Sequence, residues 1–341
     1  MKKTVLFAAI VMLLSAYAQA QPVYRFTVKV GIDKESVQFI GGADAVRAKI
    51  TDMFTKVNKA FNYTRQFDAV YDFVVDWDAF YIYEGLSTEE VHKPHPDHDY
   101  LVVIDGLKSD PKEVGGGWYG ADIQTIYHAR THTDHFNDPF EKNAIDGIIH
   151  EFGHARGMPD IYAMQVNADR NPIAPVACYG ERCIMNYPYG ETLWSDYAVN
   201  MINLSKDKRI EIDELVAAMC PEKIRITVLD PADAPVKDAK VTLYPVPWYS
   251  YSVSETPLTE KVTDKKGLCE LPGDVYGKTE EFGLGCPNIF VKAEHDGLTA
   301  YGWLPLYEVQ NAAFDGKEAY EMTLRLKALT PSKPFEFKIN R

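Results

Sequence analysis

Hydrophobic and polar positions in the first half of the chain follow the periods of both strands and helices. Apolar residues alternate with polar ones over Tyr24–Val30, as in a strand with one buried face. Denser apolar runs over Ala69–Phe80 and Tyr100–Ile104 predict buried strands. Between the first two strands, apolar residues recur every three or four positions over Ala43–Phe61, which predicts an amphipathic helix.

A long helix is predicted near the middle of the chain. It follows a glycine-rich bulged or edge strand at Gly115–Gly120 and a further strand at Ile123–His128. Asp138 supplies an N-cap acid, Pro139 suits the first helical position, and Glu141 suits the third. The predicted buried face consists of apolar residues at helical spacing: Phe140, Ala144, Ile145, Ile148, Ile149 and Phe152.

The second half of the chain has a different pattern. From about Lys223 onward, short strands alternate with Gly, Pro and Asp turns, which predicts an all-β sandwich. Two helices are predicted before it, from Ser195 to about Leu204 and over Ile212–Cys220. The 341 residues therefore divide into residues 1–20, a domain at 21–221 and a sandwich domain at 222–341. The strands predicted in the sandwich are Ile224–Val228, Lys240–Tyr244, Glu260–Val262, Ile289–Ala293 and Met322–Leu326.

Residues 1–20 have the features of a cleavable signal peptide. Lys2 and Lys3 give a basic start, Val5–Leu14 is apolar, and Ala18–Ala20 is a small-residue cleavage site. We expect export from a bacterial cell, to the periplasm or the medium, and no membrane span afterwards. Loss of the two lysines changes the formal net charge from −13 to −15, which argues against nucleic acids and anionic membranes as partners.

The strongest chemical signal is the segment His150–Asp160, which reads H-E-x-x-H-x-x-G-x-x-D. His150 and His154 share one face of a helix and can bind one metal ion together. Glu151 lies between them and can reach a water molecule on that metal. Gly157 can end the helix in a left-handed conformation, so that Asp160 returns as a third ligand. Two imidazoles, one carboxylate and an open fourth position are typical of a catalytic zinc site.

A second motif, C-I-M-N-Y at Cys183–Tyr187, follows downstream. Together with HEFGHARGMPDIY at His150–Tyr162, it resembles the metzincin zinc peptidases whose third ligand is Asp, as in immune inhibitor A-like and snapalysin-like secreted peptidases. The resemblance implies that Met185 forms a tight "Met-turn" beneath the metal and that Tyr187 approaches the metal or the reaction intermediate. The tyrosine is more similar to astacin- or serralysin-type sequences, so the chain matches the clan better than any one family.

The resemblance also implies a fold. We expect a metzincin-like α+β domain, with a twisted, mostly parallel sheet, an active-site helix and a C-terminal helical subdomain, followed by the all-β sandwich. The segment near Trp118–Ala121 is either the sheet edge to which a peptide substrate would add as a strand, or an ordinary surface turn. In the second domain, Pro235–Tyr244 followed by Thr263–Gly267 resembles the carboxypeptidase-regulatory or transthyretin-like modules of secreted proteins.

These features predict a secreted zinc endopeptidase acting on a protein or peptide substrate; no oligomeric state is predicted. One Zn²⁺ on His150, His154 and Asp160 would activate water, with Glu151 as general base and Tyr187 as hydrogen-bond donor to the oxyanion. Two alternatives stay open. One is a binding or adhesion protein on a metzincin-like scaffold, with very narrow or no catalytic activity. The other is a zinc hydrolase of a non-peptide amide.

Further metal sites have two interpretations each. Asn203–Glu214 resembles an EF-hand-type calcium loop, because oxygen side chains fall at positions 1, 3, 5, 9 and 12. Lys208 replaces the glycine of position 6, so the alternative to a Ca²⁺ site is a solvated helix connection. Histidines near the metal helix are either solvated or ligands of a second, structural metal: His92, His95, His98, His128, His132 and His135.

Cysteines and aromatic residues complete the candidate features. Export permits disulfides, and Cys178–Cys183 and Cys269–Cys286 are candidate pairs. The total of five cysteines, which includes Cys220, leaves at least one free thiol. Trp248, Tyr249 and Tyr251 are either a sugar- or protein-binding platform or ordinary packing residues.

Overall fold

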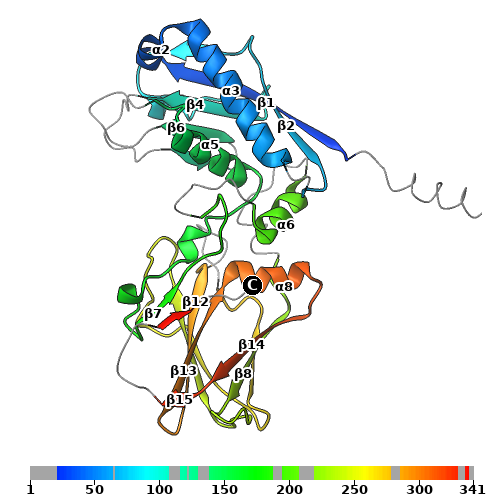
Figure 1. Cartoon of the computed structure of the whole chain (residues 1–341), viewed down its shortest axis with the longest axis vertical. Helices are drawn as coiled ribbons and strands as arrows, with labels where there is room; N and C mark the ends of the chain where they lie inside the picture. Colours follow the sequence, from blue (N-terminus) through cyan, green and yellow to red (C-terminus); the bar gives the residue numbers. More distant parts are fainter. Residues whose placement is uncertain are drawn as a thin grey trace, which may run out of the picture.

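The chain builds a mostly parallel sheet from its first half and a β-rich part from its second half (Figure 1). The computed structural model describes residues 21–63, 66–106, 116–120, 123–129, 138–186, 194–206, 219–277, 285–328 and 335–337. The predicted signal peptide at residues 1–20 therefore lies outside the described residues, as does most of the helix predicted at Ile212–Cys220. In the described part of the chain, no helix is both long and apolar enough to cross a membrane.

The first sheet has the strand order β2-β1-β4-β6-β5, with β3 also paired to β1. All of its pairings are parallel except that of β5 with β6, which is antiparallel. The predicted mostly parallel sheet is therefore confirmed. The apolar run at Ala69–Phe80 forms only the short strand β2, followed by a turn into β3. The strands are β1 (Val23–Asp33), β2 (Val70–Val75), β3 (Tyr81–Tyr83), β4 (Tyr100–Asp105), β5 (Gly117–Tyr119) and β6 (Thr125–Ala129).

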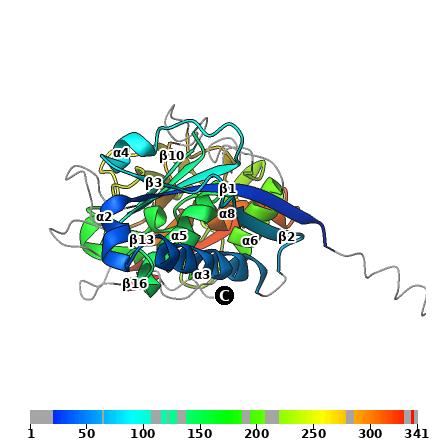
Figure 2. The same cartoon turned by 90° about the horizontal axis from the view of Figure 1, so that it is seen from above.

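Helices cover both faces of this sheet (Figure 2). The core between the sheet and helices α3 (Ala43–Asn62) and α5 (Lys142–Ala155) includes Val102 and Ile104 of β4. Leu101 and Val103 point the other way, into a smaller cluster near helix α4 (Ser87–Glu90). Because β4 is buried on both faces, its sequence is apolar from Tyr100 to Ile104 rather than alternating. A short helix, α2 (Lys34–Ile40), lies between β1 and α3.

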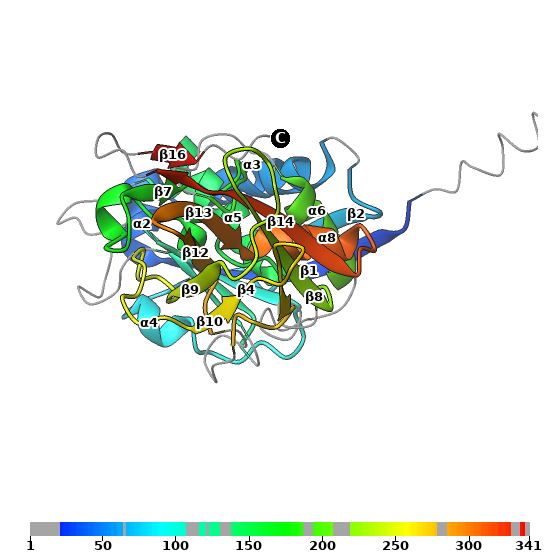
Figure 3. The same ribbon diagram turned by 90° about the horizontal axis from the view of Figure 1, so that it is seen from below.

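The β-rich part contains two main sheets (Figure 3). One is antiparallel throughout, in the order β10-β9-β12-β13-β15, and the other has the order β11-β8-β14. They approach closely at Gly302 of β13, where an added Cβ would lie 2.8 Å from Leu324 of β14. The strands are β8 (Lys223–Leu229), β9 (Lys240–Val246), β10 (Thr259–Val262), β11 (Leu268–Pro272), β12 (Asn288–His295), β13 (Leu298–Pro305), β14 (Ala319–Arg325) and β15 (Lys327–Ala328); β16 (Phe335–Phe337) pairs with β7 (Val176–Cys178).

One helix interrupts the region that the sequence predicts to be all β. Helix α8 (Leu306–Phe314) begins directly after β13, and it packs against helix α6 (Asp196–Ser205) of the first half. The Tyr197 hydroxyl donates a hydrogen bond of 2.7 Å to Gln310 Oε1 across this contact. The prediction of an all-β region was wrong here, because α8 packs between helix α6 on one side and strands β13 and β14 on the other.

The β-rich part also contacts the segment that follows the H-E-x-x-H helix. The Asn288 side chain donates 2.7 Å to the carbonyl of Met164, which lies in the short 3₁₀ helix Tyr162–Met164. The backbone N–H of Val253 donates 3.0 Å to the carbonyl of Arg170, at the end of the 3₁₀ helix Ala168–Arg170. The second half is thus anchored next to the candidate metal ligands.

Candidate metal centre

Helix α5 carries the H-E-x-x-H motif but begins later than predicted, at Lys142 rather than Pro139, with Glu141 as its N-cap residue. The Asp138 side chain instead accepts a 2.9 Å hydrogen bond from the backbone N–H of Phe140. Aspartate readily bonds to the backbone two residues ahead, and this local turn competes with a helix cap. The predicted cap therefore forms a turn that precedes the helix.

The end of α5 agrees with the prediction for Gly157. This residue has φ +91°, and its N–H donates 2.9 Å to the carbonyl of His154. The N–H of Met158 donates 3.1 Å to the carbonyl of Gly153. These two bonds form the Schellman ending, which requires a left-handed residue and therefore favours glycine. The reversal directs the chain toward Asp160.

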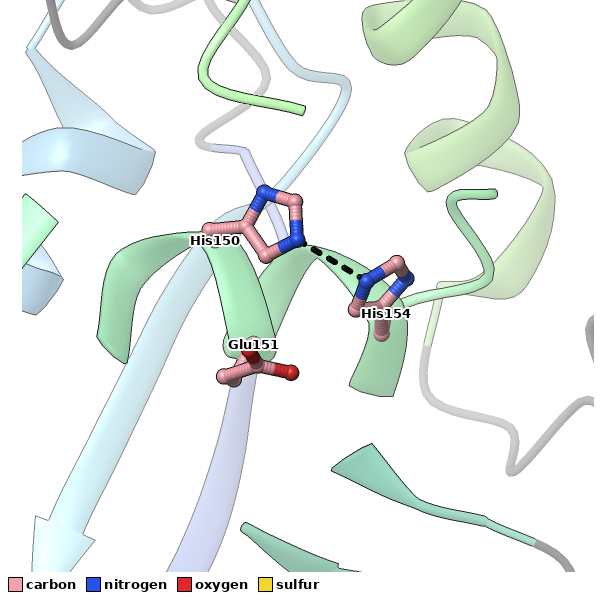
Figure 4. Close-up of side chains that lie close together, drawn as sticks. All are labelled: His150, Glu151 and His154. Atoms are coloured by element: carbon pink, nitrogen blue, oxygen red, sulfur yellow. Dashed lines mark hydrogen bonds between the residues drawn. The ribbon is translucent and has the colours of Figure 1, made fainter. Parts of the chain in front are cut away.

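Two imidazoles and one carboxylate meet beyond this turn. His150 Nε2 and His154 Nε2 are 3.0 Å apart, and Asp160 Oδ1 lies 3.1 Å from each. Around a tetrahedral zinc ion with bonds of about 2.0–2.2 Å, ligand atoms are about 3.4 Å from one another. The triangle is close to that size. Three groups that could hold a metal ion, His150, Glu151 and His154, also lie within 4.8 Å of one another (Figure 4).

The outer nitrogens of both imidazoles define their tautomers. His150 Nδ1 lies 2.9 Å from the carbonyl oxygen of Ile184, and His154 Nδ1 lies 2.6 Å from that of Met158. Because a carbonyl oxygen only accepts, each Nδ1 carries the hydrogen, and Nε2 of a neutral ring presents a lone pair. Carbonyl partners of this kind orient metal-binding histidines.

The atoms at the centre of the site fit a cation. Asp160 Oδ1 is buried and, among the described residues, has no well-formed hydrogen bond. Three lone-pair atoms at this spacing repel one another unless a cation or a proton lies between them. Burial opposes the charged form of His154, but the charge and hydrogen bond of Asp160, together with the charge of Glu151 and the Met158 carbonyl, raise its pKa to about 9. Burial opposes ionisation of Asp160, yet the two histidines hold its pKa well below the usual range.

Glu151 lies beside the two imidazoles rather than between them (Figure 4). Its residue is half-buried. Burial raises the pKa of Glu151, and the neighbouring histidines offset only part of this effect. A carboxylate with a raised pKa is a better proton acceptor than an exposed glutamate.

The predicted Met-turn lies against helix α5. The Asn186 N–H donates 2.9 Å to the carbonyl of Cys183, which closes a turn around Ile184 and Met185. An added Cβ at Gly153 would overlap the Met185 sulfur and lie 3.2 Å from its methyl carbon. Met185 therefore packs against the helix next to His154. Tyr187, the predicted catalytic tyrosine, lies outside the described residues.

A tyrosine from the β-rich part reaches the site. The Tyr249 hydroxyl donates 2.9 Å to Asp160 Oδ2, the carboxylate oxygen that faces away from the imidazoles. Burial and the charge on Asp160 raise the pKa of Tyr249, so the hydroxyl keeps its proton. Tyr162 stacks on the His150 ring at 5.9 Å and lies 6.5 Å from the Tyr249 ring. The sequence singled out Tyr249 only as a possible platform residue, because its long separation from Asp160 conceals the contact.

The weaker metal predictions find no support among the described histidines. His95, His98 and His128 contact Ile123, Asp76 and Pro139, respectively, through Nε2. In the described part of the chain, the metal-binding group identified is that of helix α5. His132, His135 and most of the Asn203–Glu214 loop lie outside the described residues, so the second metal at those histidines and the Ca²⁺ site stay predictions.

The candidate disulfides are absent. All five cysteines lie in the described residues and are free thiols, so the pairings Cys178–Cys183 and Cys269–Cys286 were wrong. Closeness in sequence did not place either pair of sulfurs in bonding position. Four of the five residues are buried, where cysteine packs as a small apolar side chain.

Comparison with known proteins assigns no family. No protein-family model matches the chain, and no curated protein matches it. Among solved structures, the Bacillus anthracis TIE protein is 17% identical over 31% of this chain and 16% of that one, with a TM-score of 0.20. Wild-type catechol 1,2-dioxygenase of Acinetobacter radioresistens is 11% identical over 36% of this chain and 56% of that one, with a TM-score of 0.19. The chain spans less than two thirds of either protein, and such scores do not indicate a shared fold.

Proposed function

We propose that this protein is an exported zinc-dependent hydrolase that cleaves peptide bonds. The observation that supports this best is the triangle of His150 Nε2, His154 Nε2 and Asp160 Oδ1, with edges of 3.0 to 3.1 Å and Glu151 beside it. Two nitrogens and one oxygen leave a fourth position for water or substrate, which distinguishes catalytic from structural zinc sites.

Asp160 is a better third ligand than Glu151. Asp160 Oδ1 is buried and lies 3.1 Å from both imidazole nitrogens. The Glu151 carboxylate lies within 4.8 Å of the two histidines and is half-buried. When bound, zinc lowers the pKa of a water molecule toward neutrality and polarises the substrate carbonyl. The two backbone carbonyls that accept from the Nδ1 atoms hold the imidazoles in the orientation this requires.

Glu151 acts as the general base in this proposal. It takes a proton from the attacking water and passes that proton to the leaving amine. Tyr187 is proposed to donate a hydrogen bond to the developing oxyanion.

The sheet edge supplies a place for an extended substrate. β5 is the last strand of the first sheet, and it packs against helix α5. We propose that a peptide pairs with the outer edge of Gly117–Tyr119 and so passes alongside the metal helix. Backbone pairing of this kind favours a polypeptide over a small amide as substrate.

The test compares zinc-loaded wild type with Glu151→Ala on a mixture of denatured proteins, with zinc content measured for both. Cleavage by wild type alone, with zinc in both proteins, is the expected result. Glu89→Ala is the matched control, because Glu89 is exposed on helix α4 across the sheet from α5, and it should cleave like wild type. No cleavage by zinc-loaded wild type would contradict the peptidase and favour a binding protein or a hydrolase of another amide. A zinc-free Glu151→Ala variant would contradict the role given to Glu151.

A further inference from the structure

Tyr249 is placed at the metal centre by a turn of the β-rich part that follows strand β9. The Ser250 N–H donates 3.1 Å and its hydroxyl 2.8 Å to the carbonyl of Pro247, which closes the turn. The turn is fixed to the segment after Asp160, because the Ser252 hydroxyl donates 2.9 Å to the carbonyl of Arg170. The position of Tyr249 is therefore determined from both sides.

The backbone of this turn is strained. Tyr249 and Tyr251 have φ values of +55° and +53°, in the left-handed region that bulky side chains seldom adopt. Such a conformation persists only where the surrounding structure holds it, and it is often found at functional sites. The Tyr249 residue is also 44% exposed, so its partial burial alone does not explain its placement.

The contact made by the Tyr249 hydroxyl does explain it. Asp160 has one oxygen, Oδ1, that faces the two imidazoles, and a second, Oδ2, that must be held elsewhere. Tyr249 donates to Oδ2 at 2.9 Å. This bond stops the carboxylate from rotating, and it keeps Oδ1 at equal distance from His150 and His154. Hydrogen-bond partners of metal ligands affect metal affinity strongly even though they do not touch the metal.

We propose that Tyr249 is a positioning residue of the metal centre, and that the β-rich part therefore contributes to metal binding. The inference depends on the zinc site of the proposed function. It goes beyond that function because it assigns part of the site to the second half of the chain, which is otherwise free to act as a separate accessory module.

The test measures zinc affinity of the full-length protein by competition with a chromophoric chelator. Tyr249→Phe keeps the ring and removes only the hydroxyl, and we expect zinc to bind about 10- to 100-fold more weakly. Tyr251→Phe is the control, since Tyr251 shares the turn, the exposure and the positive φ. It should bind zinc like wild type. The metal-free variants should still unfold in a single cooperative thermal transition, which separates weaker metal binding from a loss of fold.

A double-mutant cycle distinguishes action through Asp160 from a general effect of the turn. In an Asp160→Asn background, Tyr249→Phe should weaken zinc binding much less than it does in wild type. Equal zinc affinity of wild type and Tyr249→Phe would overturn this inference and leave the proposed function standing. An equal loss in both backgrounds would also overturn it. Wild type that binds no zinc would overturn the proposed function and this inference together.

Discussion

The Met185 side chain packs directly against the backbone of Gly153, between the two histidines of helix α5. No side chain fits at this position without displacing the sulfur, and the same turn presents the Ile184 carbonyl to His150 Nδ1 at 2.9 Å. The helix and the turn are thus fixed to each other at the metal centre.

Overpacking at Gly153 should cost about 1–3 kcal/mol, of which helix propensity returns about 1 kcal/mol, so Gly153→Ala should destabilise the protein by up to about 2 kcal/mol. Gly147→Ala is the control in the same helix, because an added Cβ there meets no atom within 4 Å. It should stabilise the protein by about 0.5–1 kcal/mol through helix propensity. Urea unfolding of both variants measures the difference. A Gly153→Ala protein as stable as wild type would show that Met185 is free to move aside.

Arg156, at the end of helix α5, is fully buried. It donates 2.7 Å to the Tyr100 hydroxyl, and its guanidinium lies 4.6 Å from the centre of the Phe26 ring. Arg156→Ala should lower the free energy of unfolding by about 3 kcal/mol, because it leaves both a cavity and a buried hydroxyl that has lost a partner. Arg25→Ala removes an exposed ion pair with Asp72 and should cost less than about 1 kcal/mol. Similar losses for the two variants in denaturant unfolding would contradict this account.

Removal of the metal should reduce thermal stability. In the proposed site, bound zinc would separate the lone pairs of His150, His154 and Asp160, and a ligand at 100 times its Kd stabilises a fold by about 2.7 kcal/mol. Calorimetry before and after treatment with a chelator should therefore show a lower Tm without zinc, restored when zinc is added back. The Tm of the Asp160→Asn variant should change less on removal of zinc than that of wild type. An unchanged Tm for zinc-loaded wild type would contradict metal binding in the folded state.

The cysteines should be inert in the folded protein. Burial raises the pKa of Cys178 and Cys286 to about 12, and those of Cys220 and Cys269 to about 11. Because the thiolate is the reactive form, iodoacetamide at pH 8 should leave these thiols unmodified until urea is added. The rate at which iodoacetamide labels the folded protein should rise only as the pH approaches 11. Mass spectrometry of labelled protein measures this, and cysteines that resist labelling even in urea would indicate disulfides instead.

The sequence predicted the elements whose pattern is local. Strand β4 was predicted because burial on both faces makes Tyr100–Ile104 a continuous apolar run. The end of α5 was predicted because Gly157 is needed at its left-handed turn. The start of α5 was misplaced because Asp138 can cap either a turn or a helix. Helix α8 was missed because its apolar residues are buried by distant elements, helix α6 and strands β13 and β14, that its own sequence does not reveal.

The residues of the candidate site also fall into a local group that the sequence predicts and a distant residue that it does not. His150, Glu151, His154 and Asp160 share one short segment, so their spacing alone predicted that they meet. Tyr249 is 89 residues away from Asp160, and no local pattern connects the two. The need for glycine at position 153 was equally hidden from the sequence, because it depends on where the Met185 side chain packs.

The separation between Tyr249 and Asp160 also has a consequence for the order of assembly. The proposed ligands enclose only a short stretch of chain, so bringing them together costs little loop entropy and can precede completion of the polypeptide. Tyr249 can contact Asp160 only after strands β8 and β9 have been synthesised and folded. A nascent chain therefore gains the metal-binding segment first, and the contact that steadies it arrives later, with the carboxyl-terminal half.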